Sequence, residues 1–252
     1  MLETSTTQDA TTAPKTTDSE FAAPAATPQR WDGYRDIHKA LRLFMCDTLT
    51  RVGRADPGDA QEVGLALAQV GELMDLCELH VRDENAFIHP ALERVQPGSA
   101  ARIAAEHVTH LESIASLRDL AAFAANARDD ARGAALFRLY HALALFVAEN
   151  FEHMHAEEAT HNPVLWAHYS DAELVAIEHA LVASIPPEAM VKALHWFLPA
   201  MNAPERLAML SGMRAGMPAP AFQGVLDIAR RTLAPADHAK LLRGLDTAAQ
   251  PA

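Results

Sequence analysis

The chain has 252 residues with a formal net charge of −12, and 50% of its residues are hydrophobic. The acidic surplus repels phosphate groups, so we expect neither a nucleic-acid partner nor binding to an anionic membrane. Two cysteines are too few for a disulfide framework and indicate reduced thiols in a cytoplasmic protein. Because no run of about 18 apolar residues occurs, no membrane-spanning helix is expected.

The composition divides the chain into three parts. Residues 1–29 are rich in Thr, Ala and Pro and lack an apolar stretch, which predicts a disordered tail and not a signal peptide. Residues 30–166 are predicted to form a helical domain. Residues 167–252 are predicted to form a helical extension.

Four long segments of the central part carry apolar residues at helical spacing, and Ala and Leu are abundant while aromatic residues make up only 6%. The predicted helices cover residues 31–52, 60–87, 100–125 and 131–160. Asp59 and Ser99 are suited to cap the second and third helices, and Pro90 and Pro163 are predicted to end the second and fourth. Short connections favour antiparallel neighbours. We therefore predict an all-α fold, an antiparallel up-down-up-down four-helix bundle with extra C-terminal helices.

An internal repeat places two similar motifs on the second and fourth helices. His80 is followed four residues later by Glu84, and His153 is followed four residues later by Glu157. A proline and a leucine follow each histidine at matching distances. Residues four apart project from the same helix face, so imidazole and carboxylate can bind one ion or one ion pair. Imidazole suits iron, zinc or copper, and a carboxylate has two oxygens with which to bridge two ions.

The other two helices each supply histidines before these motifs. His38 lies on the first helix, and His107 and His110 lie on the third. At about 1.5 Å per residue, these side chains and those of the repeat fall near one end of the bundle. The candidate metal ligands are therefore His38, His80, Glu84, His107, His110, His153 and Glu157.

The full pattern resembles the hemerythrin and HHE cation-binding family. The matching residues are His38, His80-x-x-x-Glu84, Glu106-His107 and His153-x-x-x-Glu157-Glu158, and the resemblance covers roughly residues 31–166. It implies two iron ions, with Glu84 and Glu157 bridging and the histidines as terminal ligands. It also implies a function in binding or sensing oxygen or nitric oxide, or in handling iron and redox stress.

Two departures from oxygen-carrying hemerythrins affect this interpretation. His107 and His110 are three residues apart instead of four, so either or both are candidate ligands, and the axial level favours His107. The fourth helix has a His-x-x-x-Glu motif instead of a longer His-to-Asp spacing. This points to the HHE branch and weakens a specific prediction of oxygen transport.

Several alternatives remain open. Ferritin-like proteins use Glu-x-x-His pairs in the opposite order, and a polar stripe on an ordinary bundle would leave many buried charges without partners. Zinc is the alternative metal, because imidazole and carboxylate also suit it.

Tyr34 is expected to line the pocket or to pack in the core. The remaining histidines of this region are expected to face away from the site, namely His89, His141, His155 and His161.

The C-terminal extension carries repeated helix-start signals and no recognisable chemistry. Prolines or capping residues predict helices that begin near Ser170, Pro187, Ala203, Pro218 and Pro235. The segment is rich in methionine, which often fills irregular cores. Trp196 and Phe197 are suited to anchor it on the bundle or on a second copy of the chain, and a homo-oligomer through these helices is one expectation.

Three hypotheses of function follow. The first is a non-haem di-iron protein that binds a diatomic ligand, oxygen or nitric oxide. The second is a di-iron enzyme that acts on peroxide or oxygen, or that donates iron for repair. The third is a helical interaction module whose metal reports iron or redox state. A spectrum that returns after oxygen is removed would indicate ligand binding, and consumption of peroxide over many turnovers would indicate an enzyme. A metal-dependent change in oligomeric state or partner binding would indicate an interaction module.

Overall fold

A computed structural model describes residues 30–248, so the predicted disorder of residues 1–29 lies outside the described residues. The described chain is helical throughout, with no strand in it, which confirms the all-α prediction. The bundle region contains α1, α2, the π-helix η1, α3, α4 and α5, with bounds Arg35–Arg54, Ala60–Asp83, Glu84–Ile88, His89–Val95, Ala101–Ala125 and Asp129–His168.

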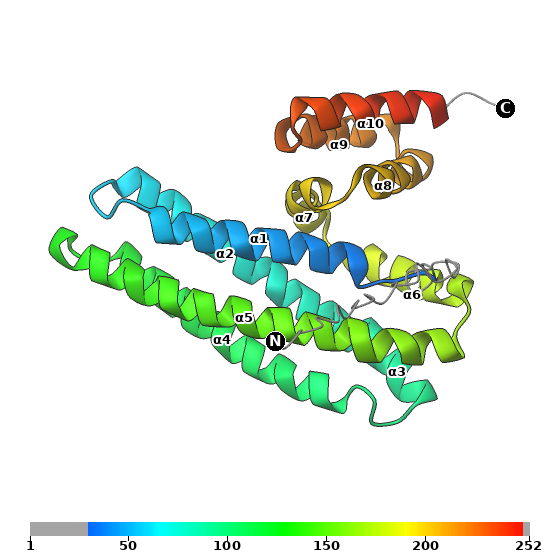
Figure 1. Cartoon of the computed structure of the whole chain (residues 1–252), viewed down its shortest axis with the longest axis horizontal. Helices are drawn as coiled ribbons and strands as arrows, with labels where there is room; N and C mark the ends of the chain where they lie inside the picture. The colour runs from blue at the N-terminus through cyan, green and yellow to red at the C-terminus, as the bar shows by residue number, and fades with distance from the viewer. Residues whose placement is uncertain (1–29, 249–252) are drawn as a thin grey trace, which may run out of the picture. The chain divides into compact units, whose positions relative to one another are not determined.

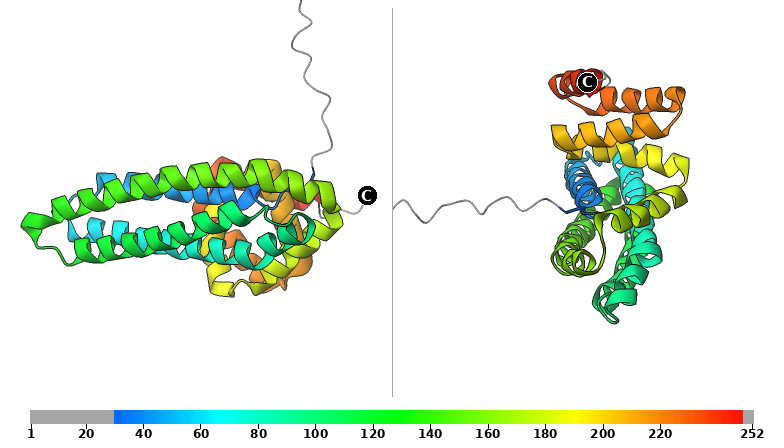
Figure 2. Two further views of the ribbon diagram at one scale, coloured as in Figure 1. Left: turned by 90° about the horizontal axis from the view of Figure 1, so that it is seen from below. Right: turned by 90° about the vertical axis from the view of Figure 1, so that its right-hand side faces the viewer.

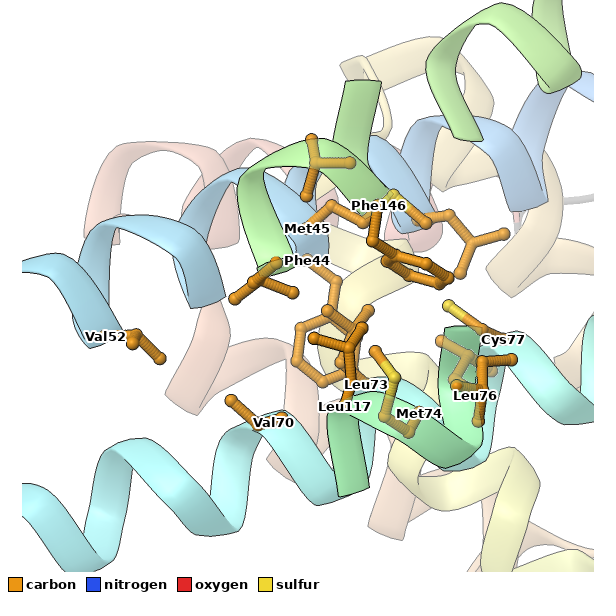
Figure 3. Close-up of a cluster of buried hydrophobic side chains, with 14 of the residues drawn as sticks. Phe44, Met45, Val52, Val70, Leu73, Met74, Leu76, Cys77, Leu117 and Phe146 are labelled. Atoms are coloured by element: carbon orange, nitrogen blue, oxygen red, sulfur yellow. The ribbon is translucent and has the colours of Figure 1, made fainter. Parts of the chain in front are cut away.

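The four long helices pack around one apolar core. α1 lies against α2 and α5, and α4 lies against α2 and α5, so the helices form a ring in the order α1, α2, α4, α5 (Figures 1 and 2). Figure 3 shows the core, in which Phe44 and Phe146 lie near Leu73 and Leu117. Each of these four side chains is at most 2% exposed. This core holds the helices in fixed register at the level of the histidines.

The second helix does not end at Pro90, so that prediction is wrong. The chain passes from α2 through the five-residue π-helix Glu84–Ile88 into α3, which runs to Val95. Pro90 lies in the first turn of α3, where its missing N–H is tolerated. The π-helix widens the turn before it, since the N–H of His89 donates to the carbonyl of Glu84 five residues earlier.

The fourth helix also continues past a proline that was predicted to end it. α5 is a single helix of 40 residues with Pro163 inside it. Tertiary contacts beyond the proline explain this: Leu165 is buried, and the indole N–H of Trp166 donates to the carbonyl of Trp31 at 2.7 Å. By length and hydropathy alone, α5 is the one helix of the described chain apolar enough to cross a membrane. The core helix of a bundle meets the same criterion, and α5 buries apolar and polar side chains against α1 and α4.

The C-terminal extension consists of short helices of equal length. α6 to α10 span Asp171–Ser184, Pro187–Ala200, Ala203–Gly216, Ala219–Thr232 and Pro235–Ala248, each with 14 residues. Ser170 and Asn202 form capping boxes, and Pro187, Pro204 and Pro220 lie in first turns. The predicted helix starts therefore hold, because capping and proline are local properties of the sequence.

The extension is anchored on the bundle through α7. The rings of Trp196 and Phe44 stack with centroids 3.8 Å apart, and Phe197 also packs against the bundle core. The Nζ of Lys39 on α1 lies 2.7 Å from the carboxylate of Glu205 on α8. Trp196 and Phe197 were expected to anchor the extension either on the bundle or on a second copy of the chain. In the structure, both side chains pack on the bundle.

Candidate metal centre

The structure brings six of the seven candidate ligands into one buried cluster. His38 comes from α1, His80 from α2, Glu84 from η1, His107 from α4, and His153 and Glu157 from α5. His38 and Glu157 are completely buried, and the side chain of His80 is 11% exposed. Long helices held in register by the core below them therefore place these polar groups inside the bundle.

The cluster is two ligand groups that share both carboxylates. His38 and His80 form one group with Glu84 and Glu157, and His107 and His153 form the other with the same two glutamates. Within each group, one ligand atom from every residue lies within 4.8 Å of the others. The arrangement therefore offers two adjacent sites joined by two carboxylates.

Each carboxylate directs a different oxygen to each group. Oε1 of Glu84 lies 3.2 Å from Nε2 of His80, and its Oε2 lies 3.2 Å from Nε2 of His107. Oε2 of Glu157 lies 3.4 Å from Nε2 of His38, while its Oε1 lies 3.4 Å from Nε2 of His153. This is the donor arrangement that two bridged metal ions require.

The hydrogen-bond inventory of the cluster also fits bound cations. All four carboxylate oxygens of Glu84 and Glu157, and Nε2 of His38 and His80, are buried with no hydrogen-bond partner among the described residues. Nε2 of His107 and Nε2 of His153 face each other at 3.1 Å. Because buried polar groups are normally paired, this concentration of unpaired acceptors fits two metal ions.

Three of the histidines are oriented by a second residue at Nδ1. His38 contacts Glu158 at 2.9 Å, His107 contacts Oδ1 of Asn85 at 2.9 Å, and His153 contacts Glu106 at 2.9 Å. A carboxylate only accepts, so the Nδ1–H of His38 and of His153 donates, and Nε2 of each ring faces the cluster. Glu106 and Glu158 belong to the sequence motifs, whereas Asn85 has no counterpart in them.

The charges around His38 stabilise its protonated form in the metal-free protein. Burial opposes that charge, but contacts with Glu157, Glu158 and Glu84 raise the pKa of His38 to about 10. Burial also opposes ionisation of Glu158, yet its contacts with His38 and Arg42 lower its pKa to about 2. Metal binding must therefore displace a proton from His38, which makes metal affinity dependent on pH.

His110, the seventh candidate, lies beside the two groups and in neither of them. It is buried on α4, and its ring meets that of His153 edge-on with centroids 4.4 Å apart. Burial, with the nearby His153, lowers its pKa to about 4, so the ring is neutral at neutral pH. The geometry places His107, not His110, among the ligand atoms.

His89 faces the interior, contrary to the expectation that it points away from the site. If the helix were regular, the nine-residue separation of His80 and His89 would place the two side chains about 180° apart around the helix axis. The π-helix contains one extra residue in its turn, which reduces this rotation by about 100° and brings His89 toward the side of Glu84. His89 is buried, and its ring stacks on that of His107 with centroids 5.0 Å apart. No periodicity in the sequence signals the extra residue.

His161 also faces the interior, and the sequence did contain a signal for it. It lies four residues after Glu157 on a regular helix, so it shares the face of that ligand. It is completely buried, and its Nδ1 lies 2.8 Å from the hydroxyl of Tyr34. Tyr34 is therefore a buried hydrogen-bond partner one turn before His38. His141 and His155 are exposed, as expected.

An apolar cavity of about 210 Å³ reaches the cluster from the side of the C-terminal extension. Tyr34, His80 and Glu84 line it on the bundle side. The opposite wall consists mostly of apolar side chains of α6, α7, α8 and the link between α6 and α7, namely Leu181, Val182, Ile185, Met190, Phe197, Met209 and Met213. The extension thus covers one face of the metal centre with hydrocarbon.

Residues 31–165 match the family model described as hemerythrin HHE cation binding domain. The matched segment contains all seven predicted ligands and includes the larger part of the chain. Comparison of the chain with curated proteins and with solved structures gives no match.

Proposed function

Because the chain belongs to the hemerythrin HHE cation-binding family, we propose that it is a non-haem di-iron protein that binds or senses a diatomic ligand, oxygen or nitric oxide. One observation carries the proposal. Glu84 and Glu157 each direct one oxygen to the His38–His80 group and the other to the His107–His153 group. Two ions bridged by carboxylates with imidazole ligands are typical of iron.

The surroundings of the centre favour a small, weakly polar ligand. The cavity beside His80 and Glu84 is lined mostly by apolar side chains, which disfavour ordered water and anions and admit diatomic molecules. Ferrous iron would supply the affinity for such a ligand. The chain itself holds the donors in place through Glu158, Asn85 and Glu106 and limits the access of water through the C-terminal helices.

A second candidate function is a di-iron enzyme that acts on oxygen or peroxide. About 210 Å³ exceeds the space that a two-atom molecule fills, so the cavity also has room for a peroxide. Reversible spectral change on removal of the gas supports ligand binding. Consumption of oxygen or peroxide over many turnovers supports catalysis.

The deciding experiment measures bound metal by elemental analysis together with the absorption spectrum. Wild type is compared with Glu84→Ala/Glu157→Ala after anaerobic loading with ferrous iron. We expect at least two irons per wild-type chain and loss of both bridged irons in the variant. The matched control is His141→Ala/His155→Ala, which removes two exposed histidines and should retain the wild-type iron content.

Other outcomes overturn parts of the proposal. Zinc bound in preference to iron, with no iron spectrum, would retain the metal site and exclude the oxygen chemistry. A folded wild-type chain that binds no metal would refute the site. A reduced di-iron protein whose spectrum does not respond to oxygen or nitric oxide would refute the diatomic ligand.

A further inference from the structure

A third group of potential ligands lies beside the two that share the bridging carboxylates. His89 on α3 and His161 on α5 each present a ligand atom within 4.8 Å of the other and of a carboxylate oxygen of Glu157. All three residues are at least nine-tenths buried. His161 lies one helical turn beyond Glu157, and the π-helix brings His89 to the same level.

The free ring nitrogens of this group lack hydrogen-bond partners. Nε2 of His89 and Nε2 of His161 are both buried with no partner among the described residues. The two rings meet edge-on, with centroids 5.7 Å apart. The Nδ1 of His161 lies 2.8 Å from the hydroxyl of Tyr34, a buried partner of the kind that orients a metal-binding imidazole through its second nitrogen.

We propose that His89, His161 and Glu157 bind a third divalent transition-metal ion, adjacent to the bridged pair. Two imidazoles and one carboxylate form a donor set suited to zinc or ferrous iron and poorly suited to calcium or magnesium. The pair itself uses different histidines, namely His38, His80, His107 and His153, so the two sites share only Glu157. Tyr34 is a positioning residue for this ion through its hydrogen bond to His161.

Zinc is the appropriate probe, because it undergoes no redox change while bound ions are counted. The purified full-length chain is freed of metal, loaded from a zinc buffer and analysed for zinc per folded chain. We expect three zinc ions in wild type, two in His89→Ala/His161→Ala and three in the control His141→Ala/His155→Ala. Circular dichroism verifies that each variant is helical.

Tyr34→Phe provides a second variant that keeps every ligand atom. Loss of the hydroxyl should weaken the third zinc by about 10-fold to 100-fold and leave the affinity of the other two unchanged. Competition with a chromophoric chelator separates these affinities. Anomalous scattering at the zinc edge from crystals of the loaded protein should show the third ion between His89 and His161.

The outcomes separate this site from the proposed pair. Two zinc ions in both wild type and His89→Ala/His161→Ala would overturn the third site and leave the pair intact. Loss of more than one ion from a helical His89→Ala/His161→Ala variant would also overturn it, since these histidines would then serve the pair. One ion in wild type that disappears in this variant would retain the third site and refute the pair.

Discussion

The bundle and the C-terminal extension stabilise their interiors in opposite ways. The bundle buries candidate metal ligands on its long helices and on η1, including His38, Glu84, His107 and Glu157. Among the described residues of α6–α10, the one buried charged side chain is Arg206, and the rest of their core is apolar. Buried carboxylates and imidazoles are costly without cations, whereas an apolar core needs none. The stability of the bundle should therefore depend on metal, and that of the extension should not.

Metal removal should have the largest effect and provides the most direct test of this difference. A cation present at about 1,000 times its dissociation constant stabilises a folded protein by about 4 kcal/mol. Chelation should lower the unfolding temperature of wild type and leave that of Glu84→Ala/Glu157→Ala unchanged. Hydrogen exchange should quicken in α2, α4 and α5, while protection in α9 and α10 persists. Equal loss of protection in both regions would contradict the comparison.

Truncation of Trp196 should separate the extension from the bundle. Its ring stacks on Phe44 at 3.8 Å and is partly buried, so Trp196→Ala should cost about 3 kcal/mol, at the low end for a large aromatic residue. We expect faster proteolysis within α7–α10 and an unchanged metal content. Val191→Ala, at an exposed position of the same helix, is the control. Loss of metal in Trp196→Ala would show that the centre requires the extension.

Substitution of Arg206 tests how the interior of the extension is stabilised. Its Nε donates to the carbonyl of Leu198 at 2.8 Å, and its Nη2 donates to the carbonyl of Met201 at 2.8 Å. Both carbonyls lie at the C-terminal end of α7, where the last backbone carbonyls of a helix have no N–H partner within the helix. Arg206→Ala should lower the free energy of unfolding by about 2 kcal/mol, measured by urea denaturation. The exposed Arg243→Ala should change it little, and an equal loss in both would reject this role.

These two regions also differ in what their sequences reveal. In the bundle, regular i to i+4 spacing on α5 carries His153, Glu157 and His161, and the same spacing on α2 carries His80 and reaches Glu84. Spacing therefore predicts which side chains share a face wherever the helix is regular. It fails for His89, because the π-helix inserts a residue that no periodicity predicts, and the expectation for His161 failed although its spacing from Glu157 was visible.

Contacts between helices were beyond prediction from spacing. Asn85 meets His107 only because η1, which continues α2, lies in register with α4, and a sequence motif cannot indicate that distance. In the extension, capping residues and prolines located each helix start. The same signals did not reveal that α7 packs on α1 or that α6–α8 cover an apolar cavity, since apolar helix faces are compatible with many partners.

The smallest effect is expected at Glu178, where α6 meets the start of the bundle. Its carboxylate accepts a hydrogen bond from the indole of Trp31 at 3.0 Å, and burial raises its pKa above the usual 4.5. The folded state then binds the proton more tightly, so the free energy of unfolding falls as pH rises from about 4.5 through this raised pKa.

Glu178→Gln removes the ionisation and keeps an acceptor for Trp31. It should raise stability at pH 7 by no more than about 0.5 kcal/mol and have no effect below pH 4. Urea titrations at both pH values measure this, with the exposed Glu188→Gln as the control. A gain at low pH, or an equal gain in the control, would show that burial of this carboxylate is not the cause.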